Sequence, residues 1–131
     1  MKLSSKARYG LKAMCCMADY YGKGVLSLPQ MAQSIGVSEK YLEQLIAVLR
    51  KAGFVEANRG ANGGYFLAKA PKDINVGEVL RALEDGLVIV DCISGECEGK
   101  CKCQTYNVWN KLYNAINECL NAMSLESLLN Q

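Results

Sequence analysis

The chain begins with apolar residues at intervals of three and four, the spacing that places side chains on one face of an α-helix. Ser4 or Ser5 can cap this first helix, because a serine hydroxyl accepts from the free backbone N–H groups of the first turn. The apolar positions of the helix are Ala7, Leu11, Met14, Ala18 and Tyr21. The pattern predicts a helix that packs one face into a core.

Two shorter helices joined by a tight turn are predicted next. Ser27 and Gln30 have the spacing of a capping box, in which each side chain satisfies a backbone N–H of the other residue. Gly36 can stop this helix, and Ser38 can cap the next one. The apolar stripe of that next helix consists of Leu42, Leu45, Ile46 and Leu49. Two short helices with a turn at Gly36 favour a helix-turn-helix.

Two strand-like runs, residues 54–57 and 65–68, follow the second of these helices. Between them, residues 58–64 read Asn-Arg-Gly-Ala-Asn-Gly-Gly, and the three glycines suit a hairpin tip or a close approach of the backbone to a partner. A hairpin directly after a helix-turn-helix is a wing. Residues 1–70 are therefore predicted to form a winged helix-turn-helix domain.

The second segment, residues 71–131, is predicted to contain a linker helix, a cysteine-rich loop and a long last helix. Asn75 can cap the linker helix, which runs through Leu83, and residues 85–104 have no periodicity. The apolar stripe of the last helix consists of Trp109, Leu112, Tyr113, Ile116, Leu120 and Met123. So continuous a stripe leaves apolar area exposed unless a second chain covers it, which favours a homodimer.

These elements together predict the fold class. It is mainly α with a small β-hairpin wing: a winged helix-turn-helix plus a long C-terminal dimerisation helix, in one compact chain. The residues expected at the dimer interface are Trp109, Leu112, Tyr113, Ile116 and Leu120.

Charge distinguishes the two segments, although the formal net charge of the chain is only +2. Residues 1–70 hold ten Lys and Arg against four Asp and Glu, whereas residues 71–131 hold five against nine. A basic first half is typical of nucleic-acid binding, although a merely solvated basic face gives the same count. No apolar run approaches the ~20 residues that span a bilayer, and no signal peptide is recognisable, so a cytoplasmic protein without membrane contact is expected.

The chain has seven cysteines and no histidine. Histidine-based catalysis and histidine metal ligation are thereby excluded, and no base–nucleophile pair is recognisable, so an enzyme is not expected. Cys92, Cys97, Cys101 and Cys103 crowd one loop, and thiolates are soft ligands that select iron–sulfur clusters, zinc or copper(I). Structural zinc, and free or disulfide-linked thiols without metal, are the alternatives at this point.

The other three cysteines, Cys15, Cys16 and Cys119, lie in apolar helical stretches. A free cysteine in such a position behaves as a small buried hydrophobe. We therefore expect these three to be structural.

Four sequence blocks resemble one known family. They are S-E-K-Y-L-E-Q-L at 38–45, L-R-K-A-G-F-V at 49–55, R-G-A-N-G-G-Y at 59–65 and V-G-E-V-L at 76–80. In this order they look like the IscR/CymR/NsrR-type winged-helix transcriptional regulators of bacteria, and the likeness covers nearly the whole chain. The resemblance implies a dimeric DNA-binding repressor or activator, which senses an iron–sulfur cluster in some members and a partner protein in others.

The expected recognition helix starts at Glu39 and enters the major groove through its N-terminal residues. Gln44 can pair with an adenine edge, Glu43 can accept from cytosine N4, and Arg59 is placed to enter a minor groove. The candidate DNA-contacting residues are Lys6, Arg8, Ser38, Lys40, Tyr41, Glu43, Gln44, Arg59, Gly60, Gly63, Gly64 and Tyr65. Each of these residues could instead be an ordinary solvated side chain.

The resemblance also implies that Cys92, Cys97 and Cys103 are cluster ligands. IscR places a histidine three residues after its third cysteine, where this chain has Tyr106, and some relatives offer an aspartate where this chain has Arg8. Cys101 is the candidate fourth ligand, and an oxygen donor or a residue of the dimer mate is the alternative.

The predicted function is a sequence-specific DNA-binding transcriptional regulator that senses iron–sulfur or redox status through the cysteine loop. One alternative is a regulator of cysteine or sulfur metabolism controlled by a partner enzyme. The other is a zinc- or thiol-dependent interaction protein without a cluster. Duplex DNA and a second copy of the chain are the expected partners.

Overall fold

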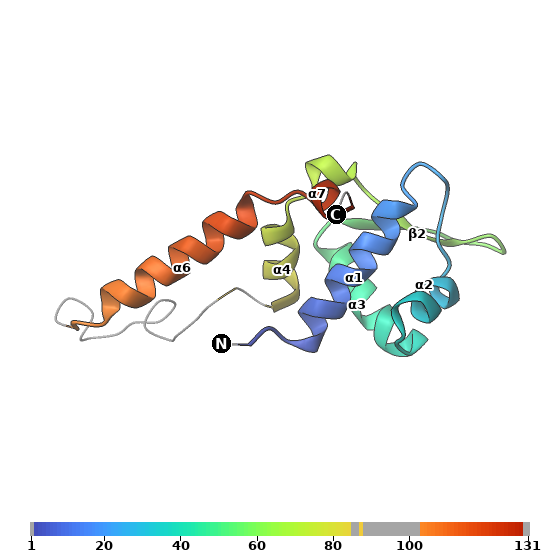
Figure 1. The fold of residues 1–131 in the computed structure, drawn as a ribbon. Helices are drawn as coiled ribbons and strands as arrows, with labels where there is room; N and C mark the ends of the chain where they lie inside the picture. The colour runs from blue at the N-terminus through green and yellow to red at the C-terminus, as the bar shows by residue number, and fades with distance from the viewer. Residues whose placement is uncertain (1, 85–86, 88–102, 130–131) are drawn as a thin grey trace.

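The structure is a computed structural model that describes residues 2–84, 87 and 103–129, and it shows a helical head from which one long helix extends (Figure 1). The head begins with α1 (Ser5–Asp19), α2 (Leu28–Ile35), α3 (Glu39–Lys51), β1 (Val55–Asn58) and β2 (Gly64–Leu67). The 3-10 helix η1 (Pro71–Asp73), α4 (Val76–Glu84), α6 (Tyr106–Asn121) and α7 (Leu125–Leu129) follow. The mainly helical fold with a hairpin wing is confirmed. Within these ranges, no helix combines the length and apolar character that crossing a bilayer requires.

The turn between α2 and α3 is fixed by local hydrogen bonds. At α2, the Ser27 hydroxyl accepts from the Gln30 N–H at 3.3 Å, and the Gln30 side chain accepts from the Ser27 N–H at 3.2 Å. Gly36 ends α2 at φ 85°, a left-handed conformation that glycine adopts without steric cost. The Ser38 hydroxyl then accepts from the Tyr41 N–H at 3.1 Å and starts α3. The helix-turn-helix therefore has the caps that the sequence predicted.

The wing is an antiparallel pair, with Asn58 opposite Gly64 next to the tip. A further backbone bridge ties the wing to the segment before α2, because Leu26 and Tyr65 exchange N–H···O bonds of 2.9 and 2.8 Å. A Cβ atom on Gly64 would collide with the Leu26 carbonyl oxygen. The wing is thus anchored, near its tip, to the segment that leads into the helix-turn-helix.

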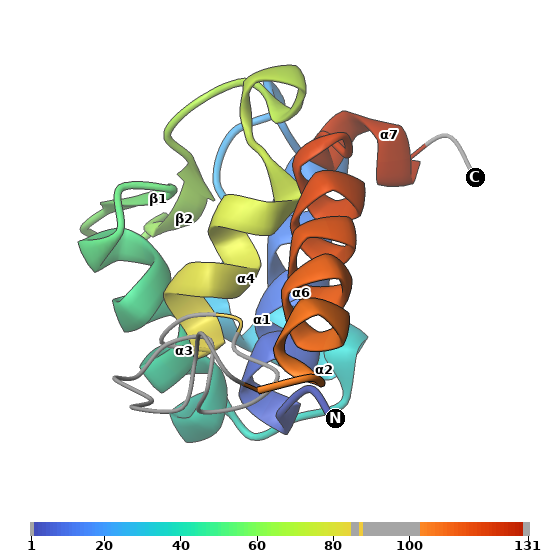
Figure 2. The same ribbon diagram turned by 90° about the vertical axis from the view of Figure 1, so that its left-hand side faces the viewer.

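The core lies where α1, α3, α4 and α7 meet. Met14, Leu49, Val79 and Leu125, one from each of these helices, are fully buried. Viewed from the end of α6, helix α4 lies beside α6 with α1 behind it (Figure 2). Both sequence segments, 1–70 and 71–131, therefore supply side chains to one core.

Helix α4 is also tied to its neighbours by polar contacts. Its last residue, Glu84, accepts from the Ser4 N–H at 2.6 Å, just before the start of α1. The Arg81 guanidinium donates to the Asn117 side-chain oxygen at 3.2 and 2.7 Å and to the Asn121 side-chain oxygen at 2.7 Å. Side-chain hydrogen bonds thus hold the C-terminal half of α6 to α4.

Three features differ from the sequence prediction. The strands are Val55–Asn58 and Gly64–Leu67, each displaced by one residue from the expected runs 54–57 and 65–68. Helices η1 and α7 were not predicted. They span only three and five residues, too few to show a helical period.

The short helix α7 provides a test of this core. We expect Leu125→Ala to lower the free energy of unfolding by about 2–5 kcal/mol, because the truncation leaves a cavity where Leu125 is fully buried. Urea unfolding followed by circular dichroism measures the change. The neighbouring Glu126 is exposed, so Glu126→Ala should stay within about 0.5 kcal/mol of the parent protein. Equal stability of the two variants would contradict the buried position of α7.

Candidate nucleic-acid interface

Helix α3 turns an apolar face to the core and a polar face to solvent. Leu42 and Leu45 are buried, whereas Lys40, Glu43 and Gln44 are exposed. The exposed side chains offer the hydrogen-bond donors and acceptors that can pair with base edges in a major groove. The predicted recognition face is therefore accessible to a partner.

Tyr41 in the first turn of α3 is half-buried and has a partner within the chain. Its ring meets the ring of Tyr9 from α1 edge to face, with centroids 6.2 Å apart and an interplanar angle of 83°. Ser38, another candidate DNA contact, is the N-cap residue of the same helix. Both residues help to build the start of α3, and their contact with DNA stays a prediction.

The wing glycines have an explanation inside the molecule. Gly60 has φ 119°, which L side chains rarely adopt. A Cβ atom on Gly63 would lie 2.5 Å from the Asn58 carbonyl oxygen, and Gly64 lies against Leu26. The chain's own backbone therefore requires these glycines, whether or not a partner also approaches them.

Two grooves flank the wing. Arg59, which is exposed, lines the groove between the wing and the start of α2, together with Arg50 and the half-buried Tyr65. The other groove runs between β1 and the end of α3, where Arg50 and Lys51 line it. Sequence reasoning did not single out Arg50 and Lys51. The available signal was a pair of basic residues in the last turn of the expected recognition helix.

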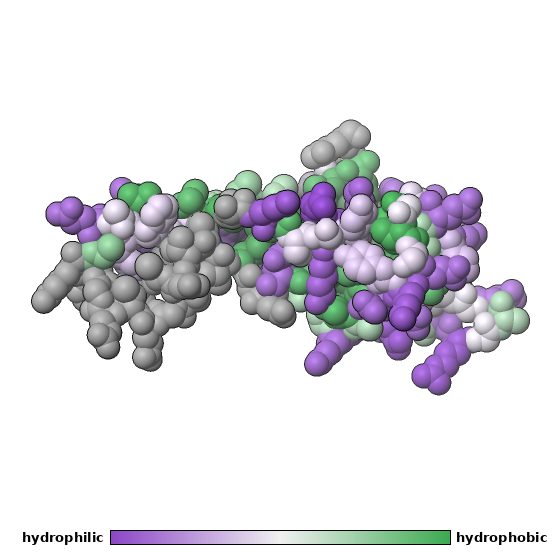
Figure 3. All heavy atoms as spheres, turned by 90° about the horizontal axis from the view of Figure 1, so that it is seen from below, coloured by the Kyte–Doolittle hydropathy of each residue, from purple (hydrophilic) through white to green (hydrophobic). Residues whose placement is uncertain are grey.

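Further basic residues lie at the start of α1. Arg8 is exposed and donates to the Ser5 hydroxyl at 3.3 Å, and Lys6 is half-buried. Hydrophilic side chains cover much of the head when the molecule is seen from below (Figure 3). The side chains expected to meet phosphates are thus available on the same head as the recognition helix.

Of the four cysteines in the cysteine-rich loop, the structure describes Cys103, and Cys92, Cys97 and Cys101 lie outside the described residues. Cys103 is exposed, and its sulfur lies 3.2 Å from the Thr105 hydroxyl. Hydrogen bonding from the Thr105 side chain, and then from its backbone N–H, lowers the pKa of Cys103. Among the described residues, no three Cys, Asp or Glu side chains gather as metal ligands do.

The three cysteines expected to be structural differ from one another. Cys15 and Cys16 are half-buried beside a groove between α1 and α2, and burial raises the pKa of the Cys15 thiol, with further contributions from Asp19 and Cys16. Cys119 is exposed on α6. The expectation that Cys119 is buried is therefore wrong for the single chain.

Helix α6 carries an apolar stripe that the described part of the chain leaves largely uncovered. None of the α6 residues is buried: the stripe residue Leu112 is 40% exposed, and Val108, the residue before Trp109, is 55% exposed. The remaining stripe residues, all half-buried, are Trp109, Tyr113, Ile116, Leu120 and, just after the helix, Met123. Hydrophobic side chains are visible along this extension of the molecule in Figure 3.

Comparison with known sequences places this architecture among transcriptional regulators. The sequence profile of Rrf2, described as an iron-dependent transcriptional regulator, matches residues 3–131. The chain is 40% identical over 128 residues to the HTH-type transcriptional regulator CymR of Bacillus subtilis, covering 98% of this chain and 89% of that protein. It is 37% identical over 131 residues to the HTH-type transcriptional regulator IscR of Pectobacterium carotovorum, covering 99% and 80%.

Comparison with solved structures also places the chain among transcriptional regulators. IscR of T. potens superposes with a TM-score of 0.82 at 43% identity, covering 99% of this chain and 87% of that one. The structure of CymR, described as the global cysteine regulator of B. subtilis, gives a TM-score of 0.83 at 38% identity, covering 99% and 97%. The chain is therefore a regulator and not an enzyme. It belongs to the Rrf2 family of transcriptional regulators.

Proposed function

We propose that two copies of this chain form a cytoplasmic regulator that binds specific duplex DNA and senses iron–sulfur or redox status through residues 85–104. The observation that carries the DNA-binding part is the exposed polar face of α3 next to a wing that bears an exposed Arg59. A recognition helix and an adjacent wing can engage a major groove and the neighbouring minor groove together.

In this proposal some residues read the DNA sequence and others hold the DNA backbone. Gln44 and Glu43 read base edges, and Arg59 enters the minor groove. Lys6, Arg8 and Lys40 contact phosphates, which fix the register of the protein on the duplex without reading its sequence. Tyr41 reaches either a base or a phosphate from the first turn of α3.

The proposal is tested on a DNA duplex that the protein selects from a pool of random sequences. On that duplex we expect Arg59→Ala to weaken binding, and Gln44→Ala to cost about 1–3 kcal/mol and to relax the preference at one base position. Lys6→Ala should instead weaken binding to every duplex and lower the salt dependence by about one unit of slope. Fluorescence anisotropy at several salt concentrations separates these effects. Unchanged affinity for both Arg59→Ala and Gln44→Ala would show that the reading head is misplaced.

The uncovered apolar stripe of α6 supports a homodimer. We expect a second copy of the chain to cover this stripe, because a self-complementary stripe on one helix can pair with the same stripe of another copy across a two-fold axis. Two heads related by such an axis should bind a pseudo-palindromic site, with half-sites roughly one or two helical turns apart.

The donor set of the cysteine loop supports an iron–sulfur cluster. Cys92, Cys97 and Cys103 would hold it, with Cys101 as the fourth ligand, and the cluster would supply a redox-active centre that depends on iron and sulfide. The Thr105 hydroxyl at 3.2 Å from the Cys103 sulfur fits a thiolate ligand, because an outer hydrogen bond orients and stabilises the thiolate. Four thiolates could also hold structural zinc.

Sensing requires that the cluster-bound and cluster-free proteins differ in DNA affinity. Residues 85–104 join α4 to α6, so a ligand there acts on the connection between the head and the dimer helix. A difference in operator affinity between anaerobically purified and cluster-depleted protein is the corresponding measurement.

Similarity to CymR supports a second candidate function. That relative is described as the global cysteine regulator of B. subtilis. A regulator of cysteine or sulfur metabolism, controlled by a partner enzyme, would use its cysteines for redox sensing without a cluster. Iron and sulfide analysis of anaerobically purified protein separates the two candidates, and zinc without sulfide would indicate the zinc- or thiol-dependent alternative.

A further inference from the structure

Two cations meet at one aromatic ring on α1. The Lys12 Nζ atom lies 5.1 Å from the centroid of the Tyr9 ring, and the Arg8 Cζ atom lies 5.8 Å from the same centroid. Both distances fall within the range of a cation–π contact. The spacing of Arg8 and Lys12, four residues apart, places them on one face of the helix.

Neither cation is neutralised by the part of the chain that the structure describes. Within residues 2–84, 87 and 103–129, the polar and ring contacts of Arg8 are to the Ser5 hydroxyl and the Tyr9 ring, and that of Lys12 is to the same ring. An aromatic ring attracts a cation through its quadrupole but carries no net negative charge. Two exposed positive charges therefore lie against one ring without a carboxylate partner among the described residues, an arrangement that favours an external anion.

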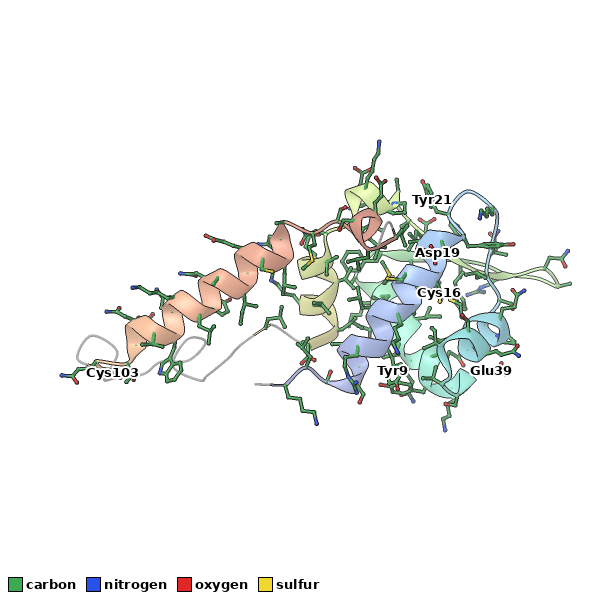
Figure 4. All side chains as sticks on the ribbon, in the orientation of Figure 1. Tyr9, Cys16, Asp19, Tyr21, Glu39 and Cys103 are labelled. Carbon is green, nitrogen blue, oxygen red and sulfur yellow. The ribbon has the colours of Figure 1, made fainter. Side chains whose placement is uncertain are left out.

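This pair lies beside the start of the recognition helix. The Tyr9 ring that holds both cations also holds Tyr41, in the first turn of α3, edge to face. Figure 4 shows Tyr9 on α1 and Glu39 at the start of α3 along the same lower edge of the molecule. Arg8 and Lys12 also line a groove between α1 and α2. The uncompensated charge is thus close to the end of α3 that is expected to enter the major groove.

We propose that Arg8 and Lys12 together bind a backbone phosphate of duplex DNA next to the major groove, and that Tyr9 is the positioning residue of this site. The Tyr9 ring contacts both cations and also the Tyr41 ring, so that the phosphate contact and the base-reading helix form one unit. The inference rests on the proposed function, because α3 brings the duplex to this corner. It adds Lys12 and Tyr9 to the interface and assigns them different roles.

The salt dependence of binding tests this site. We compare the selected duplex with a scrambled duplex of about 30 base pairs, by fluorescence anisotropy between about 50 and 200 mM salt. Lys12→Gln should weaken binding to both duplexes roughly five- to tenfold and lower the salt slope by about 0.9. Lys12→Arg should restore the slope, because the charge returns.

Tyr9 variants separate positioning from direct contact. Tyr9→Phe keeps the ring and should bind as the parent protein does, whereas Tyr9→Leu should lower the salt slope without removing any charge. Lys72→Gln is the matched control, because Lys72 is exposed and belongs to η1, which lies at the opposite, upper edge of the molecule (Figure 1). It should leave the slope unchanged.

The outcomes distinguish this site from the proposed function. If Lys12→Gln keeps the parent slope while Arg59→Ala loses affinity, the phosphate site is wrong and the reading head stands. If the parent protein binds neither duplex, the proposed function fails and this site fails with it. Should Tyr9→Leu not fold, Lys12→Gln decides alone, since Lys12 is exposed and contributes nothing to the core.

Discussion

Serine in place of Cys92, Cys97 or Cys103 is expected to abolish the visible absorption of the anaerobically purified protein. Each substitution replaces a soft thiolate with a hard hydroxyl, which is a poor ligand for iron in a cluster. The loss should be nearly complete for each single variant, because each variant leaves the proposed cluster one thiolate short of its ligand set. Absorption spectra with iron, sulfide and zinc analysis measure it.

Cysteines outside the loop provide the controls. Cys15→Ser and Cys119→Ser should keep the full absorption, because these residues lie on α1 and α6 and are not part of the proposed ligand set. Cys101→Ser tests the fourth ligand: a retained cluster would shift that role to an oxygen donor or to the dimer mate. Stoichiometric zinc without sulfide in the parent protein would show that the loop holds zinc and that the cluster proposal is wrong.

Charge placed in the apolar stripe of α6 is expected to separate the two copies. Ile116→Asp introduces a carboxylate where the dimer would bury it, and an unpaired buried charge strongly opposes association. Since no α6 residue is buried in the single chain, the head should remain folded as a monomer. Sedimentation should show the monomer at micromolar concentration, and affinity for the pseudo-palindromic duplex should fall with it.

The same helix supplies the matched control. Asn114 is exposed and lies off the apolar stripe, so Asn114→Asp adds the same charge to α6 without touching the interface. This variant should stay dimeric, and circular dichroism should show the same helix content in both. A parent protein that is already monomeric at micromolar concentration would remove the basis of the dimer proposal.

Much of the head could be predicted because its structure is determined locally. Ser4, Ser27 and Ser38 each accept a hydrogen bond from a residue three positions later, and the Asn75 side chain accepts from the Glu78 N–H at 3.1 Å in the same way. Such caps depend on a few neighbouring residues, so the sequence displays them directly. The apolar stripes of α1 and α3 are visible for a similar reason, because their period is set by the helix itself.

Features set by distant partners could not be predicted. The tip end of the wing is fixed by pairing between Leu26 and Tyr65, and the segment before α7 pairs through Ser124 with Asn75. The exposure of Cys119 depends on what covers α6, not on its apolar neighbours in sequence. At the candidate site, the Tyr9–Tyr41 contact joins two helices, and no pattern of neighbouring residues in the sequence predicts it.

The joint between α4 and α6 has a mechanical consequence. Arg81 donates hydrogen bonds to Asn117 and Asn121 near one end of α6. This helix has 16 residues and is about 24 Å long. A tilt of about 10° at that joint moves the far end by roughly 4 Å, a little more than one base-pair step of about 3.4 Å. Arg81 fixes the angle of α6 together with the Asn75 side chain, which donates to the Asn121 carbonyl oxygen at 2.7 Å. In the proposed dimer, a change at this joint would therefore alter the gap between the two DNA half-sites.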